Sequence, residues 1–232
     1  MSGLNERAMK RPALTRRAAG DGARLSGRQQ RLVWRIAALL LDYPGAQTLQ
    51  LLDQLRAAAM ELPTSVGEPL LEFLAEFGDV DPLRLAARYV ETFDMRRRAS
   101  LHLTYYAYGD TRKRGVALLR FKHSYRQAGT PPGEDELPDY LPLVLEFAAT
   151  IDPVQGMRLL AEHVAVLELL RLSLLDSGSP YAAVVAAVVA TLPPISAADR
   201  RRIAQLAAQG PPDEDVGLDA FTMGPPTVEG RR

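Results

Sequence analysis

The 232-residue chain contains no cysteine, and it lacks several other features that carry chemistry. Without cysteine it cannot form disulfides, hold an iron–sulfur cluster or a cysteine-ligated zinc ion, or use a thiol as a nucleophile. No apolar run approaches the roughly 20 residues that a membrane-spanning helix needs. We therefore expect a protein without a disulfide framework and without stable insertion into a membrane.

Motifs typical of enzymes are also missing. Glycine-rich phosphate loops, nucleophile elbows and the HExxH zinc pattern do not occur. The histidines are few and far apart, with no carboxylate at metal-ligand spacing: His102, His123 and His163. His163 lies in a strongly apolar segment, where a hydrogen-bonded core histidine is expected. The sequence thus predicts no catalytic residue, no metal site and no bound cofactor.

The charges balance overall but are strongly segregated. The chain has 28 basic and 28 acidic residues. Residues 1–35 carry nine basic side chains and two acidic ones, and residues 96–126 carry nine basic and one acidic. Acidic residues predominate elsewhere, including the end of the chain from residue 209. A basic island on an acidic body can recognise an anionic partner or complement its own acidic helices, and composition leaves both open.

Apolar residues recur at helical spacing through most of the chain, between recognisable start signals. Three starts place a side-chain oxygen before a proline at the first helical position: Asp81-Pro82, Asp152-Pro153 and Ser179-Pro180. Three more have a serine followed three residues later by Gln, Glu or Asp: Ser26, Ser65 and Ser196. The segment 152–176 reads as one long helix that is apolar nearly all round.

These patterns predict an all-α protein, a single-domain bundle of roughly nine helices. We expect the helical domain to span residues 26–209. Residues 1–25 have few large apolar side chains and read as a disordered basic arm. Residues 210–232, rich in proline, glycine and acids, read as a flexible acidic tail.

The segment 89–129 differs from ordinary helical sequence. Three tyrosines, at positions 105, 106 and 108, lie between two basic clusters, at positions 96–98 and 112–114. Aromatic and basic side chains together can bind single-stranded nucleic acid. Tyrosines and apolar groups can also line a groove for a partner helix. A third possibility is a loop between helices held by tyrosine hydroxyls, and the residues alone leave all three open.

Three stretches resemble the NarJ-type nitrate reductase molybdenum-cofactor assembly chaperones. They are TFDMRRRASLHLTYYAYGDTRKRG from residue 92, ELPDYLPLVLEF from residue 136, and LLDYP from residue 40. The wider group includes the TorD- and DmsD-like redox-enzyme maturation proteins, which share an all-helical fold. Those relatives carry a Glu-Pro-x-Asp-His motif, and here Glu136, Pro138, Asp139 and Tyr140 occupy the corresponding place. Because tyrosine replaces the histidine and the proline is shifted, guanine-nucleotide binding is not carried over.

The resemblance implies a cytoplasmic, non-catalytic chaperone that holds no cofactor itself. Its expected partner is the apo catalytic subunit of a respiratory nitrate reductase, bound transiently at that subunit's N-terminal segment. The client would be held competent for insertion of the molybdenum cofactor and kept from docking to the membrane too early. The resemblance leaves open whether the chaperone is a monomer or a dimer.

We expect the client segment to bind as an amphipathic helix in an apolar groove edged by residues of the segment 89–108. The predicted client-binding residues are Tyr89, Phe93, Leu101, Tyr105, Tyr106, Tyr108, Arg112, Glu136, Asp139 and Tyr140. For Asp139 there is a second interpretation, a cap on the helix that begins near Tyr140. The alternative function is a helical protein that binds single-stranded nucleic acid through residues 96–126, although the acidic body argues against it.

Overall fold

The computed structural model describes residues 25–109, 111–133 and 136–210. Within these ranges it contains twelve α-helices, a π-helical turn η1 and a 3₁₀ turn η2, and no strand, so the predicted all-α class is confirmed. The elements are α1 (Gly27–Leu41), α2 (Ala46–Gln50), α3 (Leu52–Met60), α4 (Thr64–Gly78), α5 (Pro82–Tyr89), η1 (Val90–Asp94), η2 (Arg97–Ala99), α6 (Tyr105–Tyr108), α7 (Arg112–Gln127), α8 (Leu141–Thr150), α9 (Pro153–Glu162), α10 (Val164–Asp176), α11 (Tyr181–Ala190) and α12 (Ala197–Gln209). Most of the predicted arm and tail lies outside the described residues.

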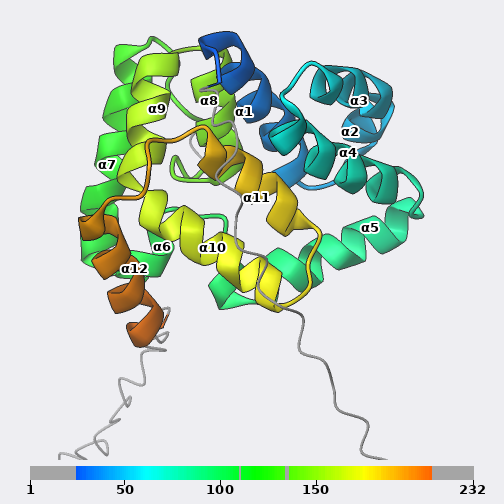
Figure 1. Ribbon diagram of the computed structural model, residues 1–232. Coiled ribbons are helices and arrows are strands. Elements are labelled where there is room, and N and C mark those ends of the chain that lie inside the picture. Colours follow the sequence, from blue (N-terminus) through cyan, green and yellow to red (C-terminus); the bar gives the residue numbers. More distant parts are fainter. Residues whose placement is uncertain (1–24, 110, 134–135, 211–232) are drawn as a thin grey trace, which may run out of the picture.

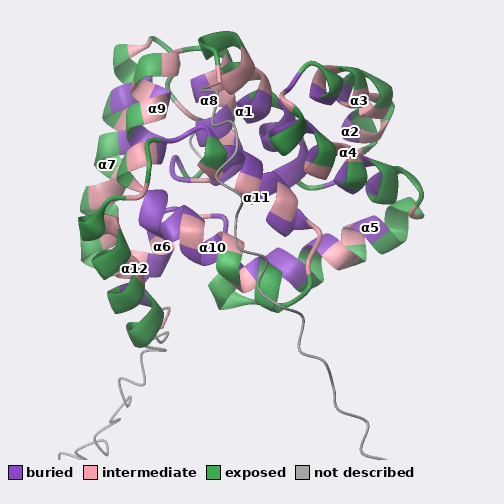
Figure 2. Cartoon of the chain, viewed as in Figure 1, coloured by how far each residue is buried: buried purple, intermediate pink, exposed green. Residues whose placement is uncertain are grey.

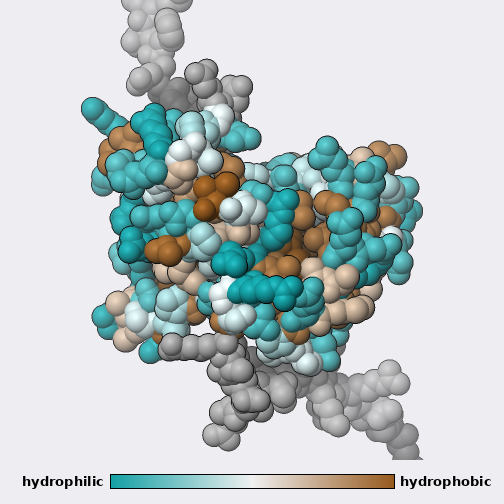
Figure 3. Space-filling view, turned by 90° about the horizontal axis from the view of Figure 1, so that it is seen from above, coloured by the Kyte–Doolittle hydropathy of each residue, from teal (hydrophilic) through white to brown (hydrophobic). Residues whose placement is uncertain are grey.

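Helix α11 lies at the centre of the bundle (Figure 1). It packs against α1, α4 and α10, while α8 packs against α1 and α9. Its alanines and valines allow this close approach, and most of its residues are buried, as the purple ribbon in Figure 2 shows. Helix α7 lies at the outer edge and is largely exposed. On the face seen in Figure 3, hydrophobic side chains form small patches bordered by hydrophilic ones.

Four of the six predicted helix starts are confirmed, and two are wrong. Ser26 and Ser196 form capping boxes, and the carboxylates of Asp81 and Asp152 accept backbone N–H groups of α5 and α9. Helix α4 instead begins at Thr64, so Ser65 already lies inside it. Helix α11 begins one residue later than predicted and is preceded by Pro180, so the hydroxyl of the serine before it makes no capping bond.

The helices are more numerous than expected because two predicted helices are divided and the short helix α6 lies where no helix was predicted. The segment after residue 45 splits at Leu51 into α2 and α3. The long helix expected over 152–176 ends at His163, whose backbone (φ −107°, ψ 15°) leaves the α-helical region. Its ring Nδ1 lies 2.8 Å from the carbonyl oxygen of Leu159, so it is a hydrogen-bonded histidine, as predicted. Burial lowers the pKa of His163.

A buried hydrogen bond joins the first helix to the end of the central one. The indole Nε1–H of Trp34 donates to Oγ1 of Thr191 over 2.8 Å, and this hydroxyl donates to the carbonyl of Val188. We expect Thr191→Val to destabilise the protein by about 1–3 kcal/mol, because the buried indole N–H loses its acceptor. Urea unfolding followed by the fluorescence of Trp34, the single tryptophan, measures this loss.

The matched control is Thr150→Val at the exposed end of α8. That change should alter the free energy of unfolding by no more than about 0.5 kcal/mol. Equal effects of the two substitutions would contradict the role given to the Trp34 bond.

Candidate functional site

Two of the stretches singled out in the sequence, residues 92–115 and 136–147, are joined by backbone hydrogen bonds. His102 and Tyr140 form an isolated antiparallel bridge. The backbone N–H of Leu103 donates to the carbonyl of Asp139 over 3.1 Å, and that of Leu141 donates to Leu101 over 2.9 Å. The chain between η2 and α6 is thereby fixed to the start of α8.

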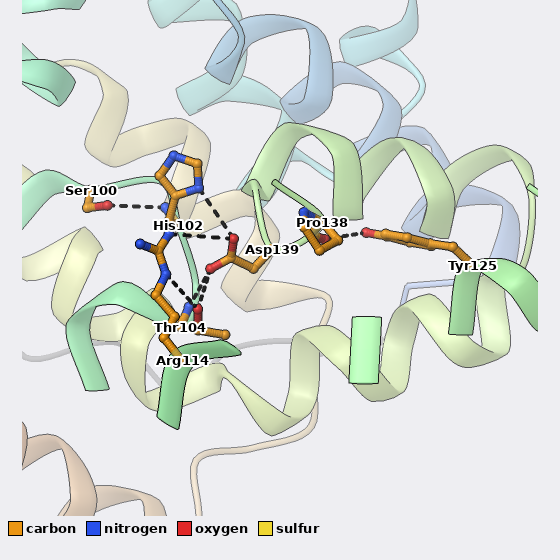
Figure 4. A network of polar contacts seen from close by, with 7 residues as sticks. All are labelled: Ser100, His102, Thr104, Arg114, Tyr125, Pro138 and Asp139. Carbon is orange, nitrogen blue, oxygen red and sulfur yellow. Dashed lines mark hydrogen bonds and ion pairs between the residues drawn. The ribbon is translucent and has the colours of Figure 1, made fainter. Parts of the chain in front are cut away.

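The carboxylate of Asp139 is fully buried where these stretches meet. One carboxylate oxygen accepts the backbone N–H of Thr104 at 3.0 Å and its hydroxyl at 2.5 Å (Figure 4). The other lies 3.4 Å from Nδ1 of His102 and 3.9 Å from the Arg114 guanidinium. Arg114 also donates from Nε to the Thr104 hydroxyl over 3.3 Å.

Two opposing effects act on the pKa of Asp139. Burial favours the neutral acid, but the contacts with His102 and the hydrogen bonds from Thr104 together outweigh burial. The pKa of this carboxyl therefore lies below its ordinary value. Because Asp139 has no exposed surface, it positions the surrounding loops rather than presenting its carboxylate at the surface. The capping interpretation is wrong, since Tyr140 precedes α8 and no side chain caps this helix.

Tyrosine hydroxyls tie the same region to the end of α1. The hydroxyls of Tyr89 and Tyr140 lie 2.9 Å apart. Tyr140 also donates to Oδ1 of Asp42 at 3.1 Å, and Tyr89 donates to the carbonyl of Leu41 at 3.1 Å. Burial raises the pKa of Tyr89 to about 12, so the phenol stays protonated and remains a donor near neutral pH. These bonds bring together α1, α5 and α8.

Beside this junction the surface is hollowed between α1 and α8. The largest of three hollows there, of about 580 Å³, is lined by Ala38, Leu39, Asp42, His102, Glu136, Leu137, Tyr140, Pro142, Leu143 and Glu146. A second hollow of about 190 Å³ shares Glu136, Leu143 and Glu146 with it and extends to Phe147 and Ile151. A third hollow, also of about 190 Å³, shares His102 and Tyr140 and extends to Tyr89, Phe93 and Leu101. We call these three adjoining hollows the α1–α8 groove.

The predicted site residues fall into three groups. Tyr89, Phe93, Leu101, Glu136 and Tyr140 line the groove, although the first three expose little surface. Asp139 lies beneath it, within the protein.

The remaining predicted residues, on α6 and α7, line none of the three hollows: Tyr105, Tyr106, Tyr108 and Arg112. The ring of Tyr106 is buried and packs with Val166, Leu169 and Leu206 of α10 and α12. The Arg114 guanidinium lies over the ring of Tyr105, 5.5 Å from its centre.

Eight further residues of the largest hollow were not predicted. Ala38 and Leu39 lie at the end of α1, Asp42 directly follows that helix, and Pro142, Leu143 and Glu146 come from α8. The other two are His102 and Leu137, which lie in loops. Helical spacing places the α1 residues near one another, but only the packing of α1 against α8 makes that face the wall of a groove.

The geometry gives little support to the nucleic-acid alternative. Stacking of successive bases needs aromatic rings with accessible faces. The buried ring of Tyr106 and the covered ring of Tyr105 do not offer such a series. The basic residues Arg96, Arg97 and Arg98 instead line a separate hollow with the ends of α10 and α12.

The described part of the chain offers neither a metal site nor a membrane-spanning helix. Within residues 25–109, 111–133 and 136–210, no group of three or more His, Asp or Glu side chains is arranged to hold a metal ion. Among the helices of the same ranges, none is both long enough and apolar enough to cross a membrane.

Comparison with known proteins places these observations in a family. The model of the nitrate reductase delta subunit family matches residues 45–187. The nitrate reductase-like protein NarX of Mycobacterium tuberculosis is 42% identical over 160 residues, which are 69% of this chain and 24% of NarX. This chain thus spans only about a quarter of that relative's length.

Two shorter relatives are matched over more of their length. The probable nitrate reductase molybdenum cofactor assembly chaperone NarJ of Bacillus subtilis is 32% identical over 164 residues, 70% of this chain and 89% of NarJ. The nitrate reductase molybdenum cofactor assembly chaperone NarJ of Escherichia coli K12 is 35% identical over 150 residues, 63% of this chain and 64% of the relative. With a family match over more than half its length, this chain belongs to the nitrate reductase delta subunit family.

Proposed function

We propose that this chain is a cytoplasmic assembly chaperone of a nitrate reductase, which binds the apo catalytic subunit and assists insertion of its molybdenum cofactor. Two relatives in the same family are named as chaperones of this kind. In this role the chain performs no catalysis, and its association with the client is transient. The observation that carries the proposal is the α1–α8 groove, which adjoins the motif shared with the NarJ-type chaperones.

The groove suits an amphipathic helix better than a rigid small molecule. Two of its hollows adjoin along α8, and the third shares His102 and Tyr140 with the largest. The largest has apolar walls from Ala38, Leu39 and Leu143. A helix presents apolar side chains at positions i, i+3, i+4 and i+7, which suit a row of adjoining hollows. We propose that the N-terminal segment of the catalytic subunit binds in this way.

The rim of the groove favours a client segment that carries basic residues. Asp42 and Glu136 are exposed at its edge. Opposite charges accelerate encounter and set the register of a bound helix, while apolar contacts supply most of the affinity. A chaperone must also release its client, so we expect a dissociation constant on the order of micromolar rather than nanomolar.

Substitution of Leu143 tests the proposal. We expect Leu143→Glu to weaken binding of a synthetic peptide, the N-terminal segment of the nitrate reductase catalytic subunit, by at least about tenfold. Leu143 lines both the largest hollow and the hollow that extends toward Ile151, and a carboxylate there would be desolvated by the peptide. Isothermal titration calorimetry measures the affinity.

The control for this experiment is Leu83→Glu on α5, where the leucine is 81% exposed and lines none of the three hollows. Because Leu143 also packs partly against the core, Glu136→Lys on the exposed rim serves as a second variant. It should weaken binding several-fold and reduce its dependence on salt. If both groove variants bind the peptide as tightly as Leu83→Glu does, the groove is not the client site.

A further inference from the structure

The α1–α8 groove has charged lining residues of one sign. The carboxylates of Asp42, Asp94, Glu136 and Glu146 line its hollows, and among the described residues no lysine or arginine does. Glu146 pairs with Arg35 of α1, whereas Asp42, Asp94 and Glu136 form no ion pair with another described residue. Carboxylates that line one concave surface reinforce one another's potential, so the groove attracts cationic segments.

The two ends of this chain differ in the sign of their charge. Residues 1–24 contain six basic side chains, Arg7, Lys10, Arg11, Arg16, Arg17 and Arg24, against two acidic ones. Apolar residues such as Leu4, Met9 and Leu14 are interspersed among them. Residues 211–232 carry five acidic and two basic side chains. An acidic groove repels the second segment and attracts the first.

The first segment is also long enough to reach the groove. Described structure begins at Leu25, directly before α1, and the groove is lined by the last turns of that helix. A helix rises 1.5 Å per residue, so the 15 residues of α1 span about 22 Å. An extended chain covers up to about 3.5 Å per residue. About eight residues suffice to return along α1, which leaves residues 1–16 to contact the groove.

We propose that residues 1–24 of this chain occupy the α1–α8 groove and compete with the client peptide. The proposal deepens the proposed function and rests on it for the identity of the competing ligand. Tethering over such a span gives an effective concentration on the order of millimolar. With an intrinsic dissociation constant of about 0.1 mM, residues 1–24 would leave about a tenth of the grooves open. A client segment displaces residues 1–24 only if it binds the groove tightly enough to outcompete them. The competition therefore makes the chaperone more selective against weakly basic segments.

The test uses the full chain with Arg7→Glu, Lys10→Glu and Arg11→Glu together. All three positions precede Leu25, where the described fold begins. We expect the triple variant to bind the synthetic client peptide about tenfold more tightly than the parent chain, by calorimetry at low salt. The control is a second triple variant with Arg158→Glu, Arg201→Glu and Arg202→Glu. It changes the net charge by the same amount, but at exposed positions on α9 and α12. A general charge effect would tighten binding equally in both variants and would overturn the proposal.

A second measurement does not depend on the client. A synthetic peptide of residues 1–24 is titrated into the triple variant, and into the same variant with Glu136→Lys added. We expect saturable binding to the first and at least about threefold weaker binding to the second. If the peptide of residues 1–24 does not bind, the inference is overturned and the proposed function is unaffected. If that peptide binds but the client peptide does not, only the proposed function is overturned. Sedimentation of the parent chain must show a monomer, because a dimer exchanging these residues would contradict an intramolecular contact.

Discussion

Gly156→Ala should destabilise the protein strongly, although it adds a single methyl group. Gly156 lies on α9, and a Cβ atom built there would be 2.3 Å from Cβ and 2.4 Å from Cα of Ala148 on α8. The second of these atoms belongs to the backbone, so the two helices must separate rather than a side chain rotate. We expect a cost of about 3 kcal/mol from overpacking, reduced by about 1 kcal/mol through the better helix propensity of alanine.

Gly115→Ala is the matched control for this prediction. Gly115 lies within α7, and nothing lies within 4 Å of the position that its Cβ would occupy. The same chemical change should therefore stabilise the protein by about 0.5–1 kcal/mol, because alanine restricts the unfolded chain and favours the helix. Urea unfolding of both variants measures the difference. Effects of the same sign at the two positions would show that α8 and α9 are not in the close contact described.

Asp139→Ala should cause the largest loss of stability among single changes at the site. The buried carboxylate accepts the backbone N–H and the hydroxyl of Thr104, and it lies beside His102 and Arg114. Alanine offers no acceptor, so the buried backbone N–H of Thr104 loses its hydrogen bond to the carboxylate. Removing one partner from a buried charged network costs about 3–5 kcal/mol. Asp79→Ala, at an exposed position after α4, should cost no more than about 0.5 kcal/mol.

The pH dependence of the free energy of unfolding distinguishes the contribution of the negative charge of Asp139 from that of its hydrogen-bond acceptors. Its pKa is lowered in the folded protein, so ionisation of Asp139 stabilises the fold fully above the ordinary carboxyl pKa of about 4. That contribution is lost as the pH falls below this value and through the folded pKa. Asp139→Asn keeps an acceptor for Thr104 but has no charge to lose. Its deficit relative to the parent should therefore shrink in acid, whereas a constant deficit between pH 7 and pH 3 would contradict the assignment.

The consequences of Asp139→Asn for client binding follow from its buried position. Asp139 fixes the backbone of residues 101–104 against the start of α8, and Tyr140 beside it lines the groove. We expect weaker peptide binding through displacement of Tyr140, without any direct contact between position 139 and the peptide.

The amino-acid sequence was sufficient to predict the fold class and much of the local structure of the protein. Side-chain caps at Ser26, Asp81, Asp152 and Ser196 depend on residues two or three positions apart, and such short-range geometry can be read directly. The family could also be predicted, because the motif from residue 92 is long and specific. The break at His163 could not, because apolar residues continue at helical spacing on both sides of it.

The sequence by itself determined the helical periodicity and the family. Only the tertiary structure decided that Tyr106 is buried, that Asp139 lies beneath the surface, and that Leu39 and Leu143 share a wall. Hydrophobic patterning tells which residues avoid water, but the same tyrosine can pack into the core or line a surface hollow. The choice depends on which helices pack against each other, and α1 meets α8 through contacts about a hundred residues apart in the chain.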